Sequence, residues 1–314
     1  MNLHVLVIVG PTASGKTRLG VEVAHRLGSE IVSADSRQVY RGLDIGTGKD
    51  LEEYARVDPP VPYHLIDIAD PEEVYTLFRY QEDCYRVLGD LAERAPFAGG
   101  EVPLLMVGGS GLYVEAVVRG YRLADVPMDR EARAALEQLP PAELVERLQR
   151  EAPEIAETTD LSISRRVIRG LEIAAYSKLS PVRYSAPPAA PRRWTVVGVT
   201  GERGELRTRI GRRLRQRLEE GMIDEVRQLL DRGVSRRRLD ELGLEYREVA
   251  AFLEGEKDLD GMISDLESAI GRFAKRQQTW FRGMERRGVP IQWMTADDVE
   301  AVVAAAFSSP PEVG

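Results

Sequence analysis

The sequence predicts an α/β protein in which a parallel β-sheet is flanked by helices and carries a helical insertion domain. Apolar runs alternate with amphipathic stretches over residues 1–119, which is the pattern of strands joined by helices. The glycine-rich stretch GPTASGKT, residues 10–17, lies directly between one such run and one such helix. Residues 120–190 then show helical periodicity without a strand signal. We therefore expect a core built from residues 1–119 and 191–314, with residues 120–190 inserted into it.

The first part of the core contains the most regular alternation. Leu3–Val9 (LHVLVIV) is a run of branched apolar residues, which is typical of a strand buried on both faces. The elements expected after it are a helix at 18–27, strands at 30–35 (EIVSAD) and 63–68 (YHLIDI), a helix at 75–94 and a strand at 102–109 (VPLLMVGG). Because ligands of such sheets bind at the carboxyl ends of the strands, we expect the functional site at that edge.

The insertion and the second part of the core are predicted to be mainly helical. Helices are expected in the insertion at 131–138, 142–150 and 162–175, before a proline-rich linker, SAPPAAPRR. A strand at 194–200 (WTVVGVT) then returns to the sheet. The helices expected after it lie at 205–220, 223–232, 240–253 and Leu259–Arg286, and residues 308–314 are expected to fray.

The composition excludes several classes of protein. Hydrophobic residues make up 43% of the chain and charged residues 30%, as in a soluble globular protein, and no apolar run approaches the roughly 20 residues that cross a bilayer. The first residues lead into a strand without the flanks of a secretory signal, so we expect a cytoplasmic protein that does not bind membranes. The single cysteine, Cys84, cannot form an internal disulfide, and the three histidines do not form a zinc cluster. Cys84 is interpreted as a small buried hydrophobe.

The arginines are unevenly distributed. The net charge of −8 argues against a polyanionic partner, but residues 203–217 hold seven arginines and residues 236–238 hold three more. The seven are Arg203, Arg207, Arg209, Arg212, Arg213, Arg215 and Arg217. Such clusters on an acidic chain indicate a local surface for a phosphate or a nucleic-acid backbone. On composition alone, an equal alternative is a solvated helix face paired with Glu219, Glu220 and Asp224.

The strongest local signal is a phosphate loop (P-loop), which consists of Gly10, Pro11, Thr12, Ala13, Ser14, Gly15, Lys16 and Thr17. Its glycines let backbone N–H groups turn toward phosphate oxygens, and the helix that begins at Lys16 adds the positive end of its dipole. The Lys16 ammonium neutralises the outer phosphate, and the Thr17 hydroxyl can hold Mg²⁺. Taken alone, the loop predicts a nucleoside-triphosphate binder. A kinase or nucleotide switch needs a metal-positioning aspartate as well, for which Asp35 and Asp67 are the candidates.

Six further blocks follow the loop in a fixed order. They are SADSRQVYRGLDIGTGK (33–49), PYHLID (62–67), GGSGLY (108–113), RRVIRGLE (165–172), GLEYRE (243–248) and KRQQTWFR (275–282). In this order the chain resembles the tRNA dimethylallyltransferases, also called tRNA isopentenyltransferases, from residue 10 to residue 282. The resemblance covers nearly the whole chain.

The resemblance implies a substrate pair and a general base. The phosphate loop would hold the diphosphate of dimethylallyl diphosphate together with Mg²⁺, and the five-carbon group would pass to the exocyclic amine of the adenosine 3′ of the anticodon in tRNA. Cleavage of the allylic C–O bond requires stabilisation of the leaving diphosphate, and the amine requires a base. Asp35 matches the family's base, at the end of a strand that we expect one strand over from the phosphate loop. The alternatives for Asp35 are a cap of the next segment or a water-mediated Mg²⁺ ligand.

Further catalytic and donor-binding residues follow from the same resemblance. Ser110 stands where the family usually has threonine, and its hydroxyl is expected to hold the amine or the diphosphate. Arg133 resembles the family's arginine after the start of the insertion and is taken as catalytic, with a solvated helix arginine as the alternative. Arg209 and Arg213 are additional expected ligands of the diphosphate.

The resemblance also assigns three segments to contact with the anticodon arm of tRNA. They comprise Asp35, Ser36, Arg37 and Gln38; Arg165, Arg166, Val167, Ile168 and Arg169; and Leu242, Gly243, Leu244, Glu245, Tyr246 and Arg247. Arginines supply phosphate contacts in such segments, and a glutamine can bond a base edge. For the second segment the alternative is a basic helix stripe. Trp280 and Phe281 are interpreted as core packing rather than a base-stacking platform, and we expect a monomer.

The chain departs from the family's pattern on the side expected to bind the anticodon arm. The insertion is short, AAYSKLSPVRYSAPP lacks the usual threonine–glycine–lysine–proline turn, and VGVTGERGEL replaces a glycine–leucine strand end. Two alternative functions remain open. They are an adenylate isopentenyltransferase, which prenylates free nucleotides, and a P-loop kinase or nucleotide switch. The insertion and the blocks GLEYRE and KRQQTWFR favour tRNA over a free nucleotide.

Overall fold

The chain divides into two compact units in the computed structural model, which describes residues 3–94, 97, 102–186 and 192–307. The larger unit combines Met1–Arg119 with Pro188–Gly314, and the smaller one is Gly120–Pro187. These boundaries lie close to the predicted ones at residues 119 and 190. The part of the chain that the structure describes contains no helix long and apolar enough to cross a membrane.

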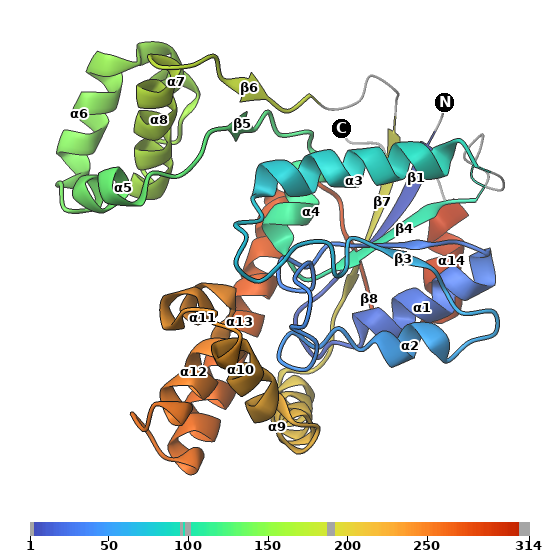
Figure 1. Cartoon of the computed structure of the whole chain (residues 1–314). Coiled ribbons are helices and arrows are strands. Elements are labelled where there is room, and N and C mark those ends of the chain that lie inside the picture. Colours follow the sequence, from blue (N-terminus) through green and yellow to red (C-terminus); the bar gives the residue numbers. More distant parts are fainter. Residues whose placement is uncertain (1–2, 95–96, 98–101, 187–191, 308–314) are drawn as a thin grey trace. The chain divides into compact units, whose positions relative to one another are not determined.

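The larger unit is built on a six-stranded sheet with the order β3-β2-β4-β1-β7-β8, and all its strand pairs are parallel. Figure 1 shows β1 and β4 at its centre. The strands are β1 (Leu3–Val9), β2 (Ile31–Ser33), β3 (Tyr63–His64), β4 (Leu104–Gly108), β7 (Arg192–Val199) and β8 (Gln292–Met294). The predicted α/β architecture is confirmed. Strand β8 was not predicted, because three half-buried residues (QWM) carry no strand pattern of their own.

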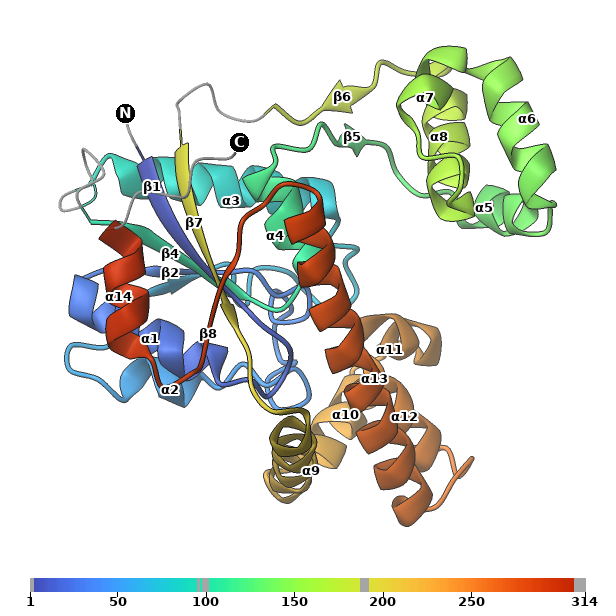
Figure 2. The ribbon, with the colours of Figure 1, turned by 180° about the vertical axis from the view of Figure 1, so that it is seen from behind.

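Helices cover both faces of the sheet because successive residues of β1 point to opposite sides. Leu6 and Ile8 pack with the helices of one face, and Val5, Val7 and Val9 belong to the core on the other face. Figure 2 shows α1 and α14 together on the first face. The helices around the sheet are α1 (Lys16–Leu27), α2 (Leu51–Ala55), α3 (Leu77–Ala92), α4 (Gly111–Val118) and α14 (Val299–Phe307). Cys84 lies fully buried in α3, as expected.

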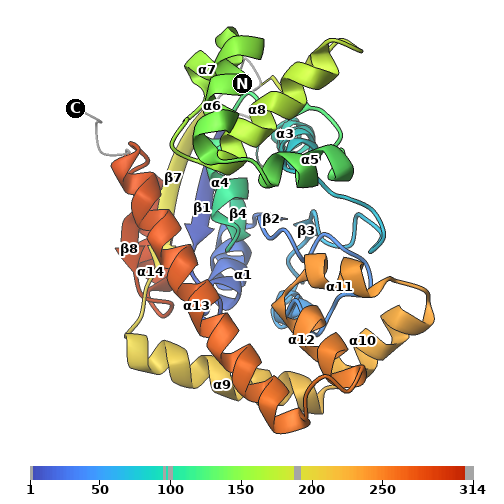
Figure 3. The ribbon, with the colours of Figure 1, turned by 90° about the vertical axis from the view of Figure 1, so that its left-hand side faces the viewer.

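The remaining helices of this unit follow β7 and belong to its larger core. They are α9 (Arg203–Glu219), α10 (Met222–Asp231), α11 (Arg236–Leu242), α12 (Leu244–Leu253) and α13 (Leu259–Arg286), whose length is visible in Figure 3. The prediction of one continuous helix over 240–253 is wrong. Gly243 adopts an extended conformation, with φ 160° and ψ 175°, which ends α11 and begins α12.

The smaller unit contains four helices among its described residues, around a core that includes Leu148, Val167 and Leu171. They are α5 (Arg130–Glu137), α6 (Pro141–Glu151), α7 (Pro153–Thr158) and α8 (Ser164–Ser177). The expectation that this unit lacks strands is wrong, because β5 (Ala124–Asp125) and β6 (Arg183–Tyr184) form an antiparallel pair. Two-residue strands are too short to show a period in the sequence. Residues 187–191 of the proline-rich linker and the tail at 308–314 lie outside the described residues.

Candidate functional site

The phosphate loop joins β1 to α1 and leaves the N-terminus of α1 open. Ala13 has φ 60° and Gly15 has φ 87°, and these left-handed residues turn the chain into the helix. Gly15 is the N-cap and supplies no side-chain hydrogen bond. The first N–H groups of α1 are therefore free of a side-chain cap, as an anion site at a helix N-terminus requires.

Two polar groups of this loop are consistent with a bound phosphorylated ligand. The Ser14 hydroxyl is buried and has no hydrogen-bond partner among the described residues. The Lys16 ammonium donates to the Pro11 carbonyl oxygen at 3.3 Å. The pKa of Lys16 is lowered to about 8, mainly by desolvation; Asp35 opposes this shift and Arg213 acts in the same direction as burial. A negatively charged ligand beside Lys16 would offset this desolvation.

Two cavities meet at the phosphate loop. The smaller, about 590 Å³, is lined by Lys16, Asp35 and Ser110, and the larger, about 1110 Å³, is lined by Lys16 and the arginines of α9. The residues common to both are Lys16, Thr17, Gly48, Arg213 and Arg217. The carboxylate and the phosphate loop predicted from the sequence therefore face one cavity, at the carboxyl ends of the strands.

A pair of arginines from α9 forms the wall shared by the two cavities. Arg217 is buried, donates from Nη1 to the Gly46 carbonyl oxygen at 3.2 Å and lies 3.7 Å from a Glu245 carboxylate oxygen. Arg213 is paired with Asp50. The alternative of a solvated face paired with Glu219, Glu220 and Asp224 is therefore wrong for these two arginines. Arg209 lines the larger cavity and pairs with Glu205 of its own helix.

Gly48 is the point where the loop that precedes α2 approaches Arg217. A Cβ atom at Gly48 would lie 1.6 Å from Arg217 Nη2, and the residue has φ 59°. Glycine at this position therefore leaves room for the Arg217 guanidinium and adopts the left-handed conformation without strain.

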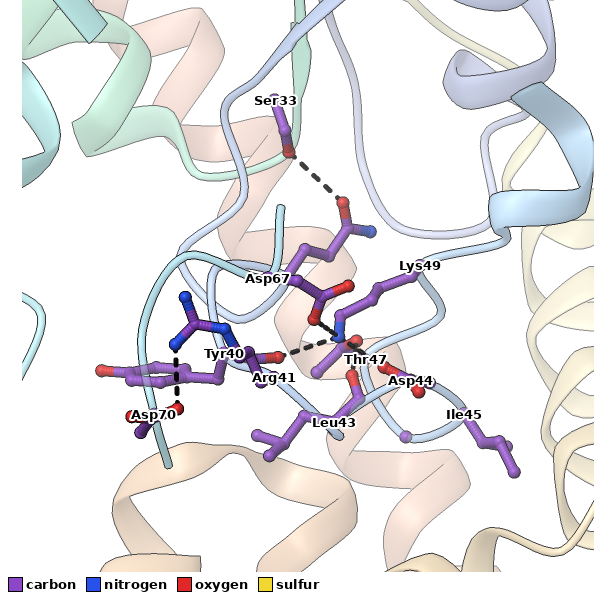
Figure 4. A network of polar contacts seen from close by, with 12 residues as sticks. Ser33, Tyr40, Arg41, Leu43, Asp44, Ile45, Thr47, Lys49, Asp67 and Asp70 are labelled. Carbon is purple, nitrogen blue, oxygen red and sulfur yellow. Dashed lines mark hydrogen bonds and ion pairs between the residues drawn. The ribbon is translucent and has the colours of Figure 1, made fainter. Parts of the chain in front are cut away.

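A polar network holds this loop, residues 43–49, as Figure 4 shows. Lys49 is 1% exposed, donates to the Tyr40 carbonyl oxygen at 2.8 Å and forms ion pairs with Asp44 and Asp67. Asp67 is thus engaged with a buried lysine. This geometry does not support Asp67 as a residue that positions a metal ion, because its carboxylate is paired with the buried Lys49 ammonium group.

The same loop also bonds to α10 and to the segment that follows β2. The Glu225 carboxylate accepts hydrogen bonds from the N–H groups of Asp44, Ile45 and Gly46 at 2.8, 2.7 and 3.0 Å. The Gln38 amide donates to the Gly48 carbonyl oxygen at 3.0 Å. No local pattern in the sequence pointed to Glu225, because its partners lie about 180 residues away.

Asp35 follows β2, and its Oδ1 accepts a hydrogen bond from the Arg37 N–H at 2.9 Å. This is the local cap given above as an alternative, and it occurs together with a position in the smaller cavity. Strand β4 lies between β1 and β2, so the expectation that the strand of Asp35 is next to that of the phosphate loop is wrong. The loop after β4 therefore lies between the phosphate loop and Asp35.

The Ser110 hydroxyl in that loop accepts a hydrogen bond from the Ser36 N–H at 2.9 Å and lies 3.2 Å from the Ser36 hydroxyl. This contact positions the segment that carries Asp35. Direct contact of Ser110 with an amine or a diphosphate stays a prediction.

Gln277 of α13 is a residue whose role the sequence did not reveal. It is 6% exposed, accepts a hydrogen bond from the Thr12 N–H at 2.8 Å and donates to the Gly109 carbonyl oxygen at 2.9 Å. The only signal was its place in the block KRQQTWFR. In the same block, Phe281 is confirmed as a core residue, whereas Trp280 packs against the core and also lines the smaller cavity.

The segment 242–247 surrounds the smaller cavity, although its members differ in exposure. Leu242 and Tyr246 are buried in the core, so any contact they make with a ligand is limited to the cavity wall. Gly243, Leu244, Glu245 and Arg247 are half-buried and line the same cavity. Burial raises the pKa of Glu245, and Arg217 opposes this shift.

The segment 165–169 of the smaller unit also contains both exposed and buried residues. Arg165 and Arg166 are exposed on α8, whereas Val167 and Ile168 are buried in the core of that unit. The side chains of Val167 and Ile168 are not available to RNA, so contacts from this segment fall to its arginines. Arg169 donates to the Ala124 and Val126 carbonyl oxygens at 3.2 and 2.8 Å.

Arg133 of α5 forms a bidentate ion pair with Glu172 of α8. Its Nε and Nη2 donate to the two carboxylate oxygens at 2.7 and 2.9 Å. The pair raises the pKa of the Arg133 guanidinium. This gives Arg133 a packing role within its unit, and its expected catalytic role stays a prediction.

The residues of the site fit a magnesium ion that arrives with a diphosphate. Among the described residues, no group of three or more His, Cys, Asp or Glu side chains could hold a metal ion. Mg²⁺ commonly binds through one or two protein groups, substrate phosphates and water. Thr17 lines both cavities beside Lys16, and its hydroxyl could supply the one protein ligand that such a magnesium ion needs.

The fold and the site together define an α/β protein in which a phosphate loop and a carboxylate line the same cavity. A family model described as IPP transferase matches residues 38–284, and one described as isopentenyl transferase matches residues 1–57. The chain belongs to the IPP transferase family and is a transferase. The family resemblance seen in the sequence is confirmed, and the kinase or nucleotide-switch alternative is wrong.

Individual relatives are similar in sequence to this chain over most of its length. It is 50% identical to tRNA dimethylallyltransferase 2 of Pelobacter propionicus, over 93% of this chain and 89% of the relative. It is 49% identical to tRNA dimethylallyltransferase 2 of Syntrophotalea carbinolica, over 94% and 95% of the two chains. The crystal structure of tRNA isopentenylpyrophosphate transferase from Bacillus halodurans is 35% identical, with a TM-score of 0.66 over 96% of this chain and 94% of that one. A eukaryotic dimethylallyltransferase acting on tRNA shares the fold at 23% identity, with a TM-score of 0.67 over 95% and 75% of the chains.

Proposed function

We propose that this enzyme transfers the dimethylallyl group of dimethylallyl diphosphate to the exocyclic amine of the adenosine immediately 3′ of the anticodon in tRNA. The observation that carries the proposal is the shared cavity, in which the phosphate loop and Asp35 face the same space. Relatives named tRNA dimethylallyltransferase, about 50% identical over most of the chain, support the identity of both substrates.

The donor's diphosphate binds at the N-terminus of α1. The open N–H groups of the first turn, Lys16 and the wall formed by Arg213 and Arg217 surround the leaving group with positive charge. These groups stabilise the negative charge that develops on the diphosphate oxygen as the allylic C–O bond breaks. When bound, Mg²⁺ held by the Thr17 hydroxyl adds further neutralisation of the diphosphate.

The acceptor amine enters from the side of Asp35. The nitrogen lone pair of the exocyclic amine forms a bond to the donor's C1, while the electrons of the C–O bond leave with the diphosphate. The Asp35 carboxylate takes the proton that the nitrogen releases. Ser110 supports this step by holding Ser36, the residue after the base, through its N–H group.

The exposed arginines of both units contact the tRNA backbone. Arg37 follows the base closely in sequence, and Arg165 and Arg166 lie on the exposed side of α8. Guanidinium groups in such positions bind phosphates and supply affinity that depends on salt. We assign these contacts to the anticodon arm. A tRNA substrate supports action in the cytoplasm, and we expect the enzyme to act as a monomer.

An adenylate isopentenyltransferase is the second candidate, because the isopentenyl transferase model matches residues 1–57, which include the phosphate loop and Asp35. Incubation with labelled dimethylallyl diphosphate and either total tRNA or AMP separates the two. We expect label in tRNA, and in the adenosine 3′ of the anticodon after nuclease digestion. Label in AMP without label in tRNA would reject the proposal.

A further inference from the structure

The block KRQQTWFR has no role in the reaction as described so far. We propose that its residue Gln277 is a positioning residue, which sets the separation between the phosphate loop and the general base Asp35. The inference rests on the proposed function, because it concerns the alignment of donor and base. It assigns a role in the reaction to helix α13, far in sequence from both groups.

The Gln277 amide forms two hydrogen bonds with backbone groups. Its Oε1 accepts from the Thr12 N–H at 2.8 Å, and its Nε2 donates to the Gly109 carbonyl oxygen at 2.9 Å. Both partners are backbone groups, one in the phosphate loop after β1 and the other in the loop after β4. One buried amide therefore joins two loops that follow neighbouring strands.

The close approach of Gly109 and Gln277 leaves no room for a side chain at residue 109. A Cβ atom at Gly109 would lie 2.5 Å from Gln277 Nε2, a distance that side chains do not adopt. Any larger residue would move the amide away from the Gly109 carbonyl group. The glycine at this position is thus matched to the glutamine that contacts it.

The path continues from Gly109 to the base through Ser110. The Ser110 N–H donates to the Ala34 carbonyl oxygen at 3.1 Å, and the Ser110 hydroxyl accepts from the Ser36 N–H at 2.9 Å. Ala34 and Ser36 are the two neighbours of Asp35, so Ser110 holds its backbone on both sides. Hydrogen bonds and consecutive residues therefore connect the phosphate loop with the base across β4.

Such a connection matters because the reaction needs three groups in line. The donor carbon is placed by the phosphate loop, and the amine must lie between this carbon and the Asp35 carboxylate. A displacement of about 1 Å can lower a rate by roughly 100-fold. Gln277 lines the smaller cavity, but both polar atoms of its amide bond to backbone groups of the two loops. We therefore expect its loss to lower kcat and to leave donor affinity nearly unchanged.

The test compares Gln277→Glu and Gln277→Met with the same changes at Gln278. Gln277→Glu keeps the acceptor for Thr12 and loses the donor to Gly109, whereas Gln277→Met loses both. Gln278 is the neighbouring residue, is half-buried and lines neither cavity. We expect kcat to fall about tenfold in Gln277→Glu and about 100-fold in Gln277→Met, with both Gln278 variants near wild type.

Donor affinity is measured separately, by calorimetric titration with inorganic diphosphate. We expect the dissociation constant to stay within about threefold of wild type in the Gln277 variants. An unchanged kcat would overturn the inference. So would a loss of diphosphate affinity as large as the loss of kcat, because Gln277 would then act on donor binding. If Gln277→Met does not fold, Gln277→Glu alone decides.

Ser110→Ala tests whether the two residues share one path. Each single change interrupts the connection, so the double variant Gln277→Glu/Ser110→Ala should lose less activity than the product of the single losses. If the loss of activity in the double variant equals the product of the two single losses, the two residues act independently and the connection is refuted.

The inference and the proposed function fail in different ways. If the wild-type enzyme labels neither tRNA nor AMP, the proposed function fails. Amide hydrogen exchange in residues 34–37, read without turnover, then still tests the connection. Faster exchange in Gln277→Glu than in Gln278→Glu supports it, and equal exchange in both variants overturns it.

Discussion

Replacing Gly48 with alanine should weaken donor binding by displacing Arg217. The new Cβ atom would lie 1.6 Å from Arg217 Nη2, so the guanidinium must leave its position beside Gly46 and Lys16. A hydrogen bond from a charged group contributes roughly 1.5–3 kcal/mol. Loss of one such bond to the diphosphate corresponds to about a tenfold to 150-fold rise in the dissociation constant.

The structure offers a matched control for the backbone strain in this variant. Gly28 has φ 61°, nearly the same as φ 59° at Gly48, but a Cβ atom there meets nothing within 4 Å. Gly28→Ala therefore carries the cost of a left-handed alanine, about 1–2 kcal/mol, without a clash. Both variants should lose stability in chemical unfolding, and Gly48→Ala alone should lose affinity for inorganic diphosphate in calorimetric titration.

If Gly48→Ala is folded and binds inorganic diphosphate as tightly as the wild-type enzyme, then Arg217 does not contact the leaving group. If both variants lose affinity equally, the effect comes from reduced stability rather than from Arg217.

Three other predictions concern the general base, the tRNA contacts and Lys16. Asp35→Asn should lower turnover by about 10²- to 10⁴-fold, as for a lost general base, while diphosphate affinity is retained, and near-normal turnover would remove Asp35 from the mechanism. Arg165→Ala/Arg166→Ala should weaken tRNA binding in filter-binding assays. The slope of log affinity against log salt concentration should fall by roughly one unit for each phosphate that the variant no longer binds, and an unchanged slope would place the RNA elsewhere. Affinity for inorganic diphosphate should fall as the pH rises through about 8, because the free enzyme's Lys16 then loses its charge, and a flat profile from pH 7 to about 9 would contradict the lowered pKa.

The same shift has a defined sign for stability. The pKa of Lys16 is lowered to about 8 in the folded state, below its ordinary value of 10.5. Burial therefore disfavours the charged form, and this cost is present below pH 8 and is relieved as the pH rises toward about 10.5. Bound diphosphate should remove the pH dependence, because it restores a partner to the ammonium group.

The sequence predicted the parts of the molecule that have local patterns. Leu3–Val9 and the phosphate loop were found because a buried strand, a glycine turn and a helix start leave marks within about 20 residues. Strand β8 was missed because three residues cannot show a period, and it forms only where β7 offers an edge. The break at Gly243 was missed because glycine inside a helical pattern does not always end the helix.

The site was predicted as a set of residues but not as a structure. Lys16, Asp35 and Ser110 were identified by motif and resemblance, and the structure brings them to one cavity. Gln277 and Glu225 were not singled out, because each bonds to backbone groups more than 160 residues away and leaves no local signal. Arg217 was only one of seven clustered arginines until the close approach of Gly48 distinguished it.

The order of the strands has a consequence for biosynthesis. β1 pairs with β7, and His4 bonds to Thr195 across 191 residues, so a growing chain exposes one edge of β1 until the whole insertion has left the ribosome. The inserted unit has its own apolar cluster and can fold during that interval. A chain that ends before α13 would contain the phosphate loop but lack the Gln277 amide, so nonsense alleles that stop translation before α13 should yield inactive protein.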